Sequence, residues 1–288
     1  MSKNLSAVAS EQFDSEVKHV FQTAGTLNGT CTVRMDVTGD TYNFRKMGKG
    51  LATQRTAPSA DSIAMDVEHS LIPVTLTDWD ADEYTDIFNA KEVNIDEVRE
   101  LGYTIASALG RRRDQIKIDA MAAGSYSATP TAGQGYLVGT DVGGVGTGWN
   151  IEKLRATKKA LDNREVPNTD RHVAITPDGL EDLLAETEVT SADYNSVKAL
   201  VQGEVNTFMG FTFHLVAPRS EGGMSKTGNL QDNYAWHMSA IGEAVGMDIT
   251  TGADWIAHKK SWLSHGEFKG GSVIRDNEGV VKIQTTED

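Results

Sequence analysis

A glycine-rich segment, residues 125–148, is the part of the sequence best suited to hold a phosphate. Dinucleotide-binding sites and P-loops use G-x-G-x-x-G or a final Gly-Lys-Ser/Thr, because backbone N–H groups must come close to the phosphate oxygens. Gly144 and Gly146 would need a third glycine where Trp149 stands, and Gly148 is followed by Trp149 instead of lysine. Both tests fail, so we interpret the segment as a mobile loop. Its glycines are Gly133, Gly135, Gly139, Gly143, Gly144, Gly146 and Gly148.

The histidines and the cysteine match no metal or nucleophile motif. There is no H-E-x-x-H, and His258 and His265, if on one helix face, would lie ~10 Å apart along its axis, too far for one ion. No G-x-S-x-G motif occurs, and Cys31, the only cysteine, stands in a strand-like run where a thiol is a poor nucleophile. We therefore predict no catalytic, cofactor-binding or metal site. The histidines are His19, His69, His172, His214, His237, His258 and His265.

Two charged clusters could also do chemistry. The acidic cluster of Asp80, Asp82, Glu83 and Asp86 could serve acid–base catalysis, but clusters of this kind usually face water. The basic triplet 111–113 is a weak DNA contact, because its side chains point in different directions around a helix. We interpret it as a solvated or acid-paired face, with Arg112 near the apolar stripe and paired with a carboxylate.

The bulk composition is that of a soluble, acidic protein. The chain has 288 residues, and 39% of them are hydrophobic. No apolar run approaches the ~20 residues that cross a bilayer, and the N-terminus lacks the apolar region of a secretory signal. A single cysteine excludes an internal disulfide and fits synthesis in a reducing cytoplasm.

The net charge also bears on possible partners. Lysine and arginine number 27 against 41 aspartates and glutamates, which gives a formal charge of -14. This balance argues against tight non-specific DNA binding, which depends on many Lys/Arg–phosphate contacts. It also makes copies of the chain repel one another, within the ~8 Å screening length of physiological salt.

Hydrophobic periodicity predicts the elements of the first half of the chain. Residues 1–30 form an arm with a short amphipathic helix that needs a partner surface. A strand at 31–37 turns at 38–40 into a returning strand, and a strand at 70–79 carries Pro73 at a sheet edge or bulge. A long helix then runs from Asn94 or Asp96 to about Ala123. Its predicted buried stripe is Val98, Leu101, Ile105, Leu109 and Ile116.

The second half alternates helices with strands, which predicts a compact α/β unit. We expect a helix capped by Asn150, a strand at 172–176, a helix opened by Pro177, a helix-like stretch at 190–203, a strand at 211–216, an extended segment at 234–238 and a short helix at 240–245. A closing hairpin is expected to join Ser272–Arg275 to Val280–Gln284.

Three segments carry a resemblance to a known family. They are TSADYNSVKALVQGEVNTFMGFTFHLVAP at 190–218, LRATKKALDNREVP at 154–167 and GSVIRDNEGVVKI at 271–283. In residue type, order and spacing they resemble major capsid proteins of tailed double-stranded DNA bacteriophages, which share the HK97-like fold. The likeness extends from about Val17 to the C-terminus.

The resemblance implies an α+β fold with five regions. These are an N-terminal arm at 1–30, an extended E-loop hairpin at 31–69, the first part of a peripheral domain at 70–125 with a spine helix at 95–123, an α/β axial domain at 126–239, and a return to the peripheral domain at 240–288. A hairpin without a helix of its own folds poorly in isolation. The E-loop is therefore expected to lie on a neighbouring subunit.

The implied function is structural. Copies of the chain would assemble in the host bacterial cytoplasm into pentamers and hexamers of an icosahedral virion shell, which encloses double-stranded DNA without sequence-specific binding and involves no membrane. Implied partners are a separate scaffolding protein, expected because the arm begins almost at Met1, a portal protein at one vertex and, optionally, a cement or decoration protein. Some members crosslink an E-loop lysine to a neighbour's asparagine. Lys46 and Lys49 lie in this region, but the asparagine and the activating acid have no match, so we predict no crosslink.

Two alternatives remain open at this stage. An encapsulin-like nanocompartment shell shares the fold and would enclose a cargo protein instead of a genome. A soluble α/β enzyme would use the glycine-rich loop for a nucleotide, although that loop fails both motif tests.

Overall fold

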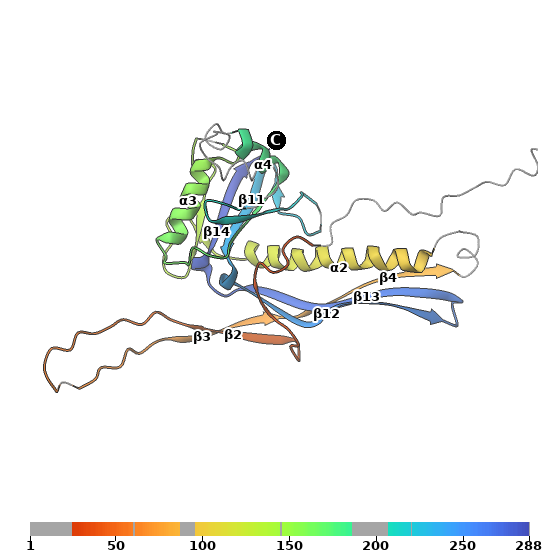
Figure 1. Cartoon of the computed structure of the whole chain (residues 1–288), viewed down its shortest axis with the longest axis horizontal. Helices are drawn as coiled ribbons and strands as arrows, with labels where there is room; N and C mark the ends of the chain where they lie inside the picture. Colours follow the sequence, from red (N-terminus) through yellow and green to blue (C-terminus); the bar gives the residue numbers. More distant parts are fainter. Residues whose placement is uncertain are drawn as a thin grey trace, which may run out of the picture.

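The computed structural model describes residues 25–59, 61–86, 96–144, 146–185, 207–219 and 221–287. The molecule has three parts: an α/β unit, a long helix lying along a narrow sheet, and a hairpin that extends past the end of that helix that lies beside the α/β unit (Figure 1). The helix expected in the N-terminal arm and the helix-like stretch at 190–203 lie outside the described residues.

The elongated unit consists of helix α2 on a four-stranded sheet. Its members are β1 (Thr32–Arg34), β4 (Thr77–Asp86), α2 (Glu97–Ala122), β12 (Ile241–Ile256) and β13 (Ser261–Ile274), with the strand order β1-β12-β13-β4. Asp96 caps α2, as predicted, by accepting a hydrogen bond from the Arg99 N–H at 3.4 Å. The predicted stripe is confirmed at Ile105 and Leu109, which are buried against the sheet.

A glycine allows α2 to lie close to this sheet. A Cβ placed on Gly266 of β13 would come within 2.3 Å of Ile105 Cγ2 and 2.9 Å of Leu109 Cδ1. Both distances are shorter than ordinary carbon–carbon contacts. The close approach of the helix therefore depends on a residue without a side chain.

The α/β unit is built on an eight-stranded sheet that is covered on both faces. Its strands are β5 (Tyr126–Ser127), β6 (Gly135–Val138), β7 (Arg171–Ile175), β8 (Thr207–Phe208), β9 (Phe211–Leu215), β10 (Lys226–Thr227), β11 (Leu230–His237) and β14 (Val280–Thr286). The order is β5-β6-β14-β11-β7-β9-β8, with β10 beside β11.

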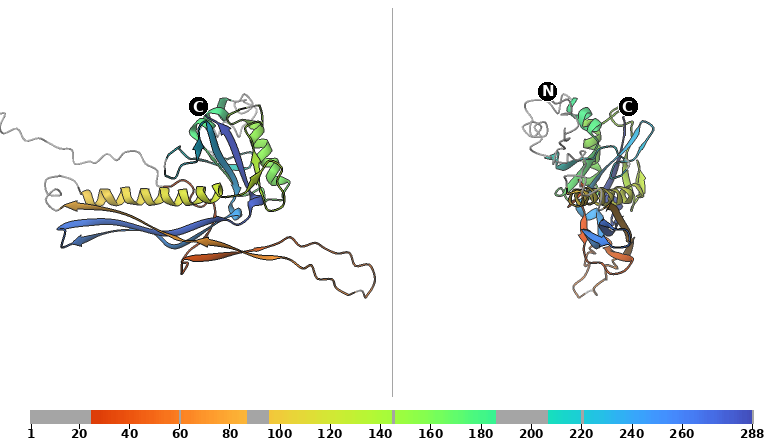
Figure 2. Two further views of the ribbon diagram at one scale, coloured as in Figure 1. Left: turned by 180° about the vertical axis from the view of Figure 1, so that it is seen from behind. Right: turned by 90° about the vertical axis from the view of Figure 1, so that its right-hand side faces the viewer.

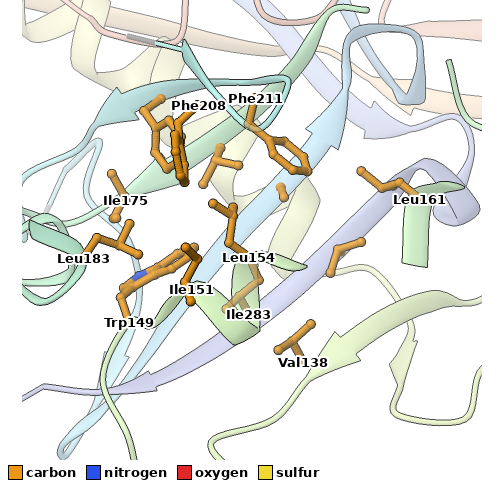
Figure 3. Close-up of a cluster of buried hydrophobic side chains, with 14 of the residues drawn as sticks. Val138, Trp149, Ile151, Leu154, Leu161, Ile175, Leu183, Phe208, Phe211 and Ile283 are labelled. Atoms are coloured by element: carbon orange, nitrogen blue, oxygen red, sulfur yellow. The ribbon is translucent and has the colours of Figure 1, made fainter. Parts of the chain in front are cut away.

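Helices α3 (Ile151–Asp162) and α4 (Pro177–Ala185) cover one face of this sheet. Their buried Leu154, Leu161 and Leu183 meet Ile175 and Phe211 of the sheet in one apolar core (Figure 3). The opposite face packs against the C-terminal end of α2 and residues 27–31. The helix starts at Asn150 and Pro177 and the strands β7, β9 and β11 are confirmed.

The extended hairpin pairs β2 (Thr41–Met47) with β3 (His69–Thr75) in antiparallel register and in a sheet of their own. The residues between these strands form a long loop that points away from the rest of the molecule (Figure 2). Pro73 lies opposite Asn43 in this two-stranded sheet, and its expected place at a sheet edge is confirmed. A strand here has one free edge, where the missing N–H of proline costs no ladder hydrogen bond.

Two strand pairings in the first half differ from the prediction. The strand at 31–37 is shortened to β1, which runs parallel to β12 and forms no hairpin with β2. Asp36, with a φ of 56°, takes the left-handed conformation and ends the extended run. The strand expected at 70–79 is divided at Leu76 between two sheets, with β3 paired to β2 and β4 paired to β13. The Leu76 N–H still bonds to the Asp40 carbonyl at 2.8 Å, at the end of the hairpin.

Two predictions in the last third are wrong. Residues 241–245 begin strand β12 instead of forming a helix, and Ala240 ends the 3-10 turn Met238–Ala240. Pairing with β13 decides a short apolar run that periodicity leaves ambiguous. Both segments of the closing hairpin are strands, but the short 3-10 turn Asn277–Gly279 leads from β13 in one sheet to β14 in the other. Residues 280–286 therefore belong to the α/β unit, and only the preceding part of 240–288 returns to the side of α2.

We expect Gly266→Val to destabilise the subunit by about 1–3 kcal/mol, because the added side chain overpacks the contact between α2 and the sheet. Urea unfolding of unassembled subunits, followed by circular dichroism, measures the effect. Gly102→Ala in α2 is the control: its Cβ meets nothing within 4 Å, so the free energy of unfolding should rise by about 0.5–1 kcal/mol. Equal midpoints for wild type and Gly266→Val would contradict the close approach.

Candidate functional site

The side chains that the sequence offers for catalysis do not form a catalytic site in the described structure. In the described part of the chain, no three His, Cys, Asp or Glu side chains are grouped as a metal site would need. Burial raises the pKa of the Cys31 thiol to about 12, and the nearby Glu243 carboxylate adds to the rise. The thiol is therefore protonated at neutral pH and unreactive. The acidic cluster lies on β4 with all its side chains exposed, as predicted.

The interpretation of the glycine-rich segment 125–148 as a loop is wrong in part, because β5 and β6 lie within it and belong to the eight-stranded sheet. The end of the segment, before α3, is held by polar contacts of its own chain. Lys153 is buried, and its Nζ donates to the carbonyls of Thr147 at 2.6 Å and Gly148 at 2.7 Å. Burial lowers the pKa of Lys153 to about 8. Because its ammonium is already bound to backbone carbonyls, the loop does not present that charge to a phosphate.

The extended hairpin is the part of the described structure that carries the most exposed apolar surface. All described residues between Gly48 and Glu68 are exposed, apart from the half-buried Val67. Large apolar side chains stand in water along the hairpin and its loop, with exposed fractions from 60% to 81%. They are Met47, Leu51, Ile63, Met65 and Leu71. Exposed apolar surface of this extent marks an interaction site.

The base of this hairpin is fixed although its loop is not. Phe44, Val74 and Leu76 form a small core with Ala244 of β12. A Cβ on Gly271 of β13 would come within 2.2 Å of the Thr75 carbonyl oxygen, so the hairpin lies directly on the sheet there. The structure thus holds a projecting loop on a rigid root.

The two lysines considered for crosslinking lie where the paired strands pass into the loop. Lys46 Nζ pairs with Asp276 at 2.9 Å, and Lys49 Nζ lies 3.8 Å from Glu165 and 4.0 Å from Glu278. Both lysines therefore contact carboxylates of their own chain. Whether a crosslink forms between subunits stays a prediction.

A buried cluster of charges joins the hairpin's support to α2. Glu243 of β12 is 2% exposed, and its carboxylate contacts Arg113 Nε at 2.5 Å and Lys117 Nζ at 3.6 Å. The Arg113 guanidinium also reaches the exposed Asp248 at 3.2 Å. Lys117, also buried, donates to the Leu27 carbonyl at 3.1 Å. One carboxylate therefore ties β12 to the long helix and, through Lys117, to residues that precede β1.

The segment before β1 is held by a second buried carboxylate. Asp114 of α2 accepts hydrogen bonds from the backbone N–H of Thr26 at 2.6 Å and of Leu27 at 3.1 Å. Of the predicted arginine triplet, Arg112 pairs with Glu221 at 2.8 Å and lies over the Trp79 ring, so its expected carboxylate partner is confirmed. The buried role of Arg113 was not predicted.

A histidine pair in the α/β sheet also escaped the sequence analysis. His172 Nδ1 and His214 Nε2 are 3.0 Å apart on neighbouring strands, with the Trp236 ring beside both. Burial lowers the pKa of His172 to about 4, with a further contribution from His214, and burial also lowers the pKa of His214. Both rings are neutral at pH 7, and one N–H joins them.

The whole chain matches a protein-family model. The family is described as phage capsid protein, and its model matches residues 5–287. The chain belongs to the phage capsid protein family. As a member it is a structural protein of the virion capsid and not an enzyme, as the sequence predicted. Among the described residues, no helix is both long and apolar enough to cross a membrane.

Solved structures share the fold of this capsid protein over its full length. The head structure of Helicobacter pylori bacteriophage KHP40 has a TM-score of 0.77 at 9% identity, covering 99% of this chain and 98% of the other. The capsid structure of cyanophage P-SCSP1u has a TM-score of 0.74 at 17% identity (100% and 96%), and Mycobacterium phage Che8 has 0.72 at 15% (98% of each chain). A search of curated proteins finds no match. These likenesses establish the mixed α/β, HK97-like capsid fold.

We expect Glu243→Gln to lower the free energy of unfolding by about 3–5 kcal/mol, because it leaves two buried cations without their counter-charge. Urea unfolding of the unassembled capsid protein measures the loss. Asp248→Asn removes a carboxylate from the same Arg113, but that carboxylate is 54% exposed, so the loss should stay below about 1 kcal/mol. Similar losses in both variants would show that the cluster is not electrostatically buried.

We also expect the histidine pair to make stability fall in acid. The folded state lowers the pKa of His172 from 6.5 to about 4, so its contribution is complete above pH 6.5 and declines as the pH falls towards 4. Asp170 opposes this shift and His237 adds to it.

Urea midpoints at pH 7 and pH 4.5 measure the decline, and His172→Gln, which does not titrate, should reduce it. His258→Gln, at an exposed position, should keep the wild-type decline. A decline that is identical in all three proteins would assign it to carboxylates alone.

Proposed function

We propose that this capsid protein is the major subunit of an icosahedral shell, assembled as pentamers and hexamers around double-stranded DNA. The observation that carries the proposal is the extended hairpin, whose apolar loop has no covering surface among the described residues of its own chain. A protein exposes such a loop at a cost, which a neighbouring copy removes by covering it. The family and the fold supply the setting for that contact.

The parts of the fold support specific regional roles. The hairpin 41–75 with its loop is the E-loop, which begins and ends later in the chain than the 31–69 expected from sequence, and α2 is the spine helix of the peripheral domain. The α/β unit, 126–239 with β14 added, is the axial domain that surrounds the capsomer axis. Residues 1–30 are proposed as an N-terminal arm, anchored at its end by Asp114.

The charge of the subunit fits a wall around nucleic acid. At -14, the protein repels phosphates instead of binding them, so packaged DNA stays mobile against the shell. The further partners are a separate scaffolding protein, a portal protein at one vertex and, optionally, a cement protein. These follow from the resemblance to tailed-phage capsid proteins. The family match favours a genome-containing shell over a nanocompartment with protein cargo.

Replacing residues 49–67 with Asn-Gly should yield folded subunits that form no shells. The Gly48 N–H already bonds to the Glu68 carbonyl at 2.8 Å, so a two-residue turn closes the hairpin without disturbing β2 or β3. Negative-stain microscopy and sedimentation measure assembly, and urea unfolding verifies the fold. Normal shells from this variant would refute the role of the loop.

Two double variants distinguish the effect of the apolar side chains on assembly from the effect of loop length. Leu51→Asp with Ile63→Asp should reduce shell yield at least tenfold, because charges then replace apolar groups in the contact. Thr53→Asp with Ser62→Asp adds the same two charges at polar, exposed positions of the loop and should assemble better. Equal yields from the two pairs would count against apolar burial as the source of the contact.

A further inference from the structure

The four-stranded sheet carries an arginine-lined groove at its β1 edge. The groove has a volume of about 580 Å³ and lies between β1 and the hairpin strand β2. Its charged lining residues are Arg34, Arg45 and Arg275, and no carboxylate lines it. We call this feature the basic groove. Three arginines line one groove of a chain whose overall charge is strongly negative.

The arginines of the basic groove lack carboxylate partners in the described part of the chain. Arg34 Nε donates to the Tyr42 hydroxyl at 3.3 Å, and the Arg275 guanidinium stands 5.2 Å from the Phe44 ring centre. The Arg275 Nε is buried without an acceptor. Guanidinium groups form their strongest hydrogen bonds with carboxylates, often through two nitrogens at once. The groove therefore presents unused donors of the kind that select an acidic partner.

A second groove of the same sheet carries the complementary charge. It has a volume of about 320 Å³ and runs from β4 across β13 to Met247 of β12. Asp78, Asp80 and Glu267 line it together with the apolar Trp79, Met247 and Phe268, and we call it the acidic groove. Lys269 also lines it, but its Nζ is bound to Asp78 at 3.2 Å and to Asp40 at 2.8 Å.

Two carboxylates of the acidic groove repel each other. Asp80 of β4 lies directly opposite Glu267 of β13 in the antiparallel ladder, and both side chains are exposed. Like charges at directly opposed positions destabilise a sheet. A cation supplied from outside the subunit would remove this repulsion. The arrangement thus points to a basic partner, independently of the arginines.

We infer that the basic groove of one subunit binds the acidic groove of the next, with Arg34 and Arg45 opposite Asp80 and Glu267. The occupant is a second copy of this chain, because the two grooves carry opposite charges and lie on different parts of one sheet, the basic groove beside β1 and the acidic groove across β12, β13 and β4. A contact between two different surfaces is heterologous, and repeated heterologous contacts form a ring when the rotation between copies closes. The inference rests on the proposed shell, and it names the charged residues through which adjacent subunits of that shell contact each other.

Charge reversal tests the contact in the full-length protein. Arg34→Glu with Arg45→Glu, and separately Asp80→Lys with Glu267→Lys, should each cut the yield of shells at least tenfold while the urea midpoint stays near that of wild type. Combining all four substitutions should restore assembly, because each groove then meets its new complement. Arg34→Gln with Arg45→Gln provides a milder second variant and should give an intermediate yield.

The lysine pair separates this contact from general repulsion. Each carboxylate-to-lysine change adds two positive charges, so Asp80→Lys with Glu267→Lys moves the net charge from -14 to -10. If only overall repulsion mattered, this variant would assemble better than wild type, and that result would overturn the inference. Unchanged assembly would overturn it too, and would be expected if the basic groove held nucleic acid. Wild-type protein that forms no shells, even when it is produced together with its scaffolding protein, would refute the proposed function itself, whereas reversed variants that assemble normally would refute only the paired grooves.

Discussion

Glu243 is buried in the protein interior, where an ionised carboxylate is stable only when cations lie next to it. Buried on β12, it is matched by Arg113 and Lys117, which stand one turn apart on α2. Desolvation of such a group costs several kcal/mol unless geometry and hydrogen bonds repay it. The cluster therefore favours one arrangement of β12 against α2, and Lys117 extends the same constraint to Leu27. The contacts of this cluster thus fix the relative positions of α2, of the four-stranded sheet and of the segment that precedes β1.

This rigid junction gives the hairpin its direction. Phe44 and Val74 pack on β12 close to Glu243, so the loop leaves the molecule from a fixed root. A loop that is already aimed loses less conformational entropy when a neighbour binds it. The apolar side chains at its end can then contribute more of their burial to the contact. The packed root of the hairpin and the exposed apolar side chains of its loop therefore both favour binding to a neighbouring copy.

The sequence predicted the elements that depend on local signals, and it missed those that depend on distant partners. Asp96 and Asn150 could be recognised as helix starts, because an N-cap side chain accepts its hydrogen bond from a backbone N–H only two or three residues later. Residues 241–245 carry no such signal, and only their pairing with β13 makes them a strand. Asp114, Lys117 and Glu243 resemble surface residues in sequence, since nothing local reveals a buried counter-charge. The family resemblance supplied the architecture, but it could not identify the grooves, whose arginines and carboxylates meet through sheet pairing.

The place of β14 has a consequence for synthesis. It runs between β6 and β11, both made before it, and it pairs with the two along their lengths. Until residues 280–286 have left the ribosome, β6 and β11 lack the strand that lies between them. The backbone N–H and C=O groups that bond to β14 have no strand partner until then. The sheet of the α/β unit can therefore be completed only after β14 has been made.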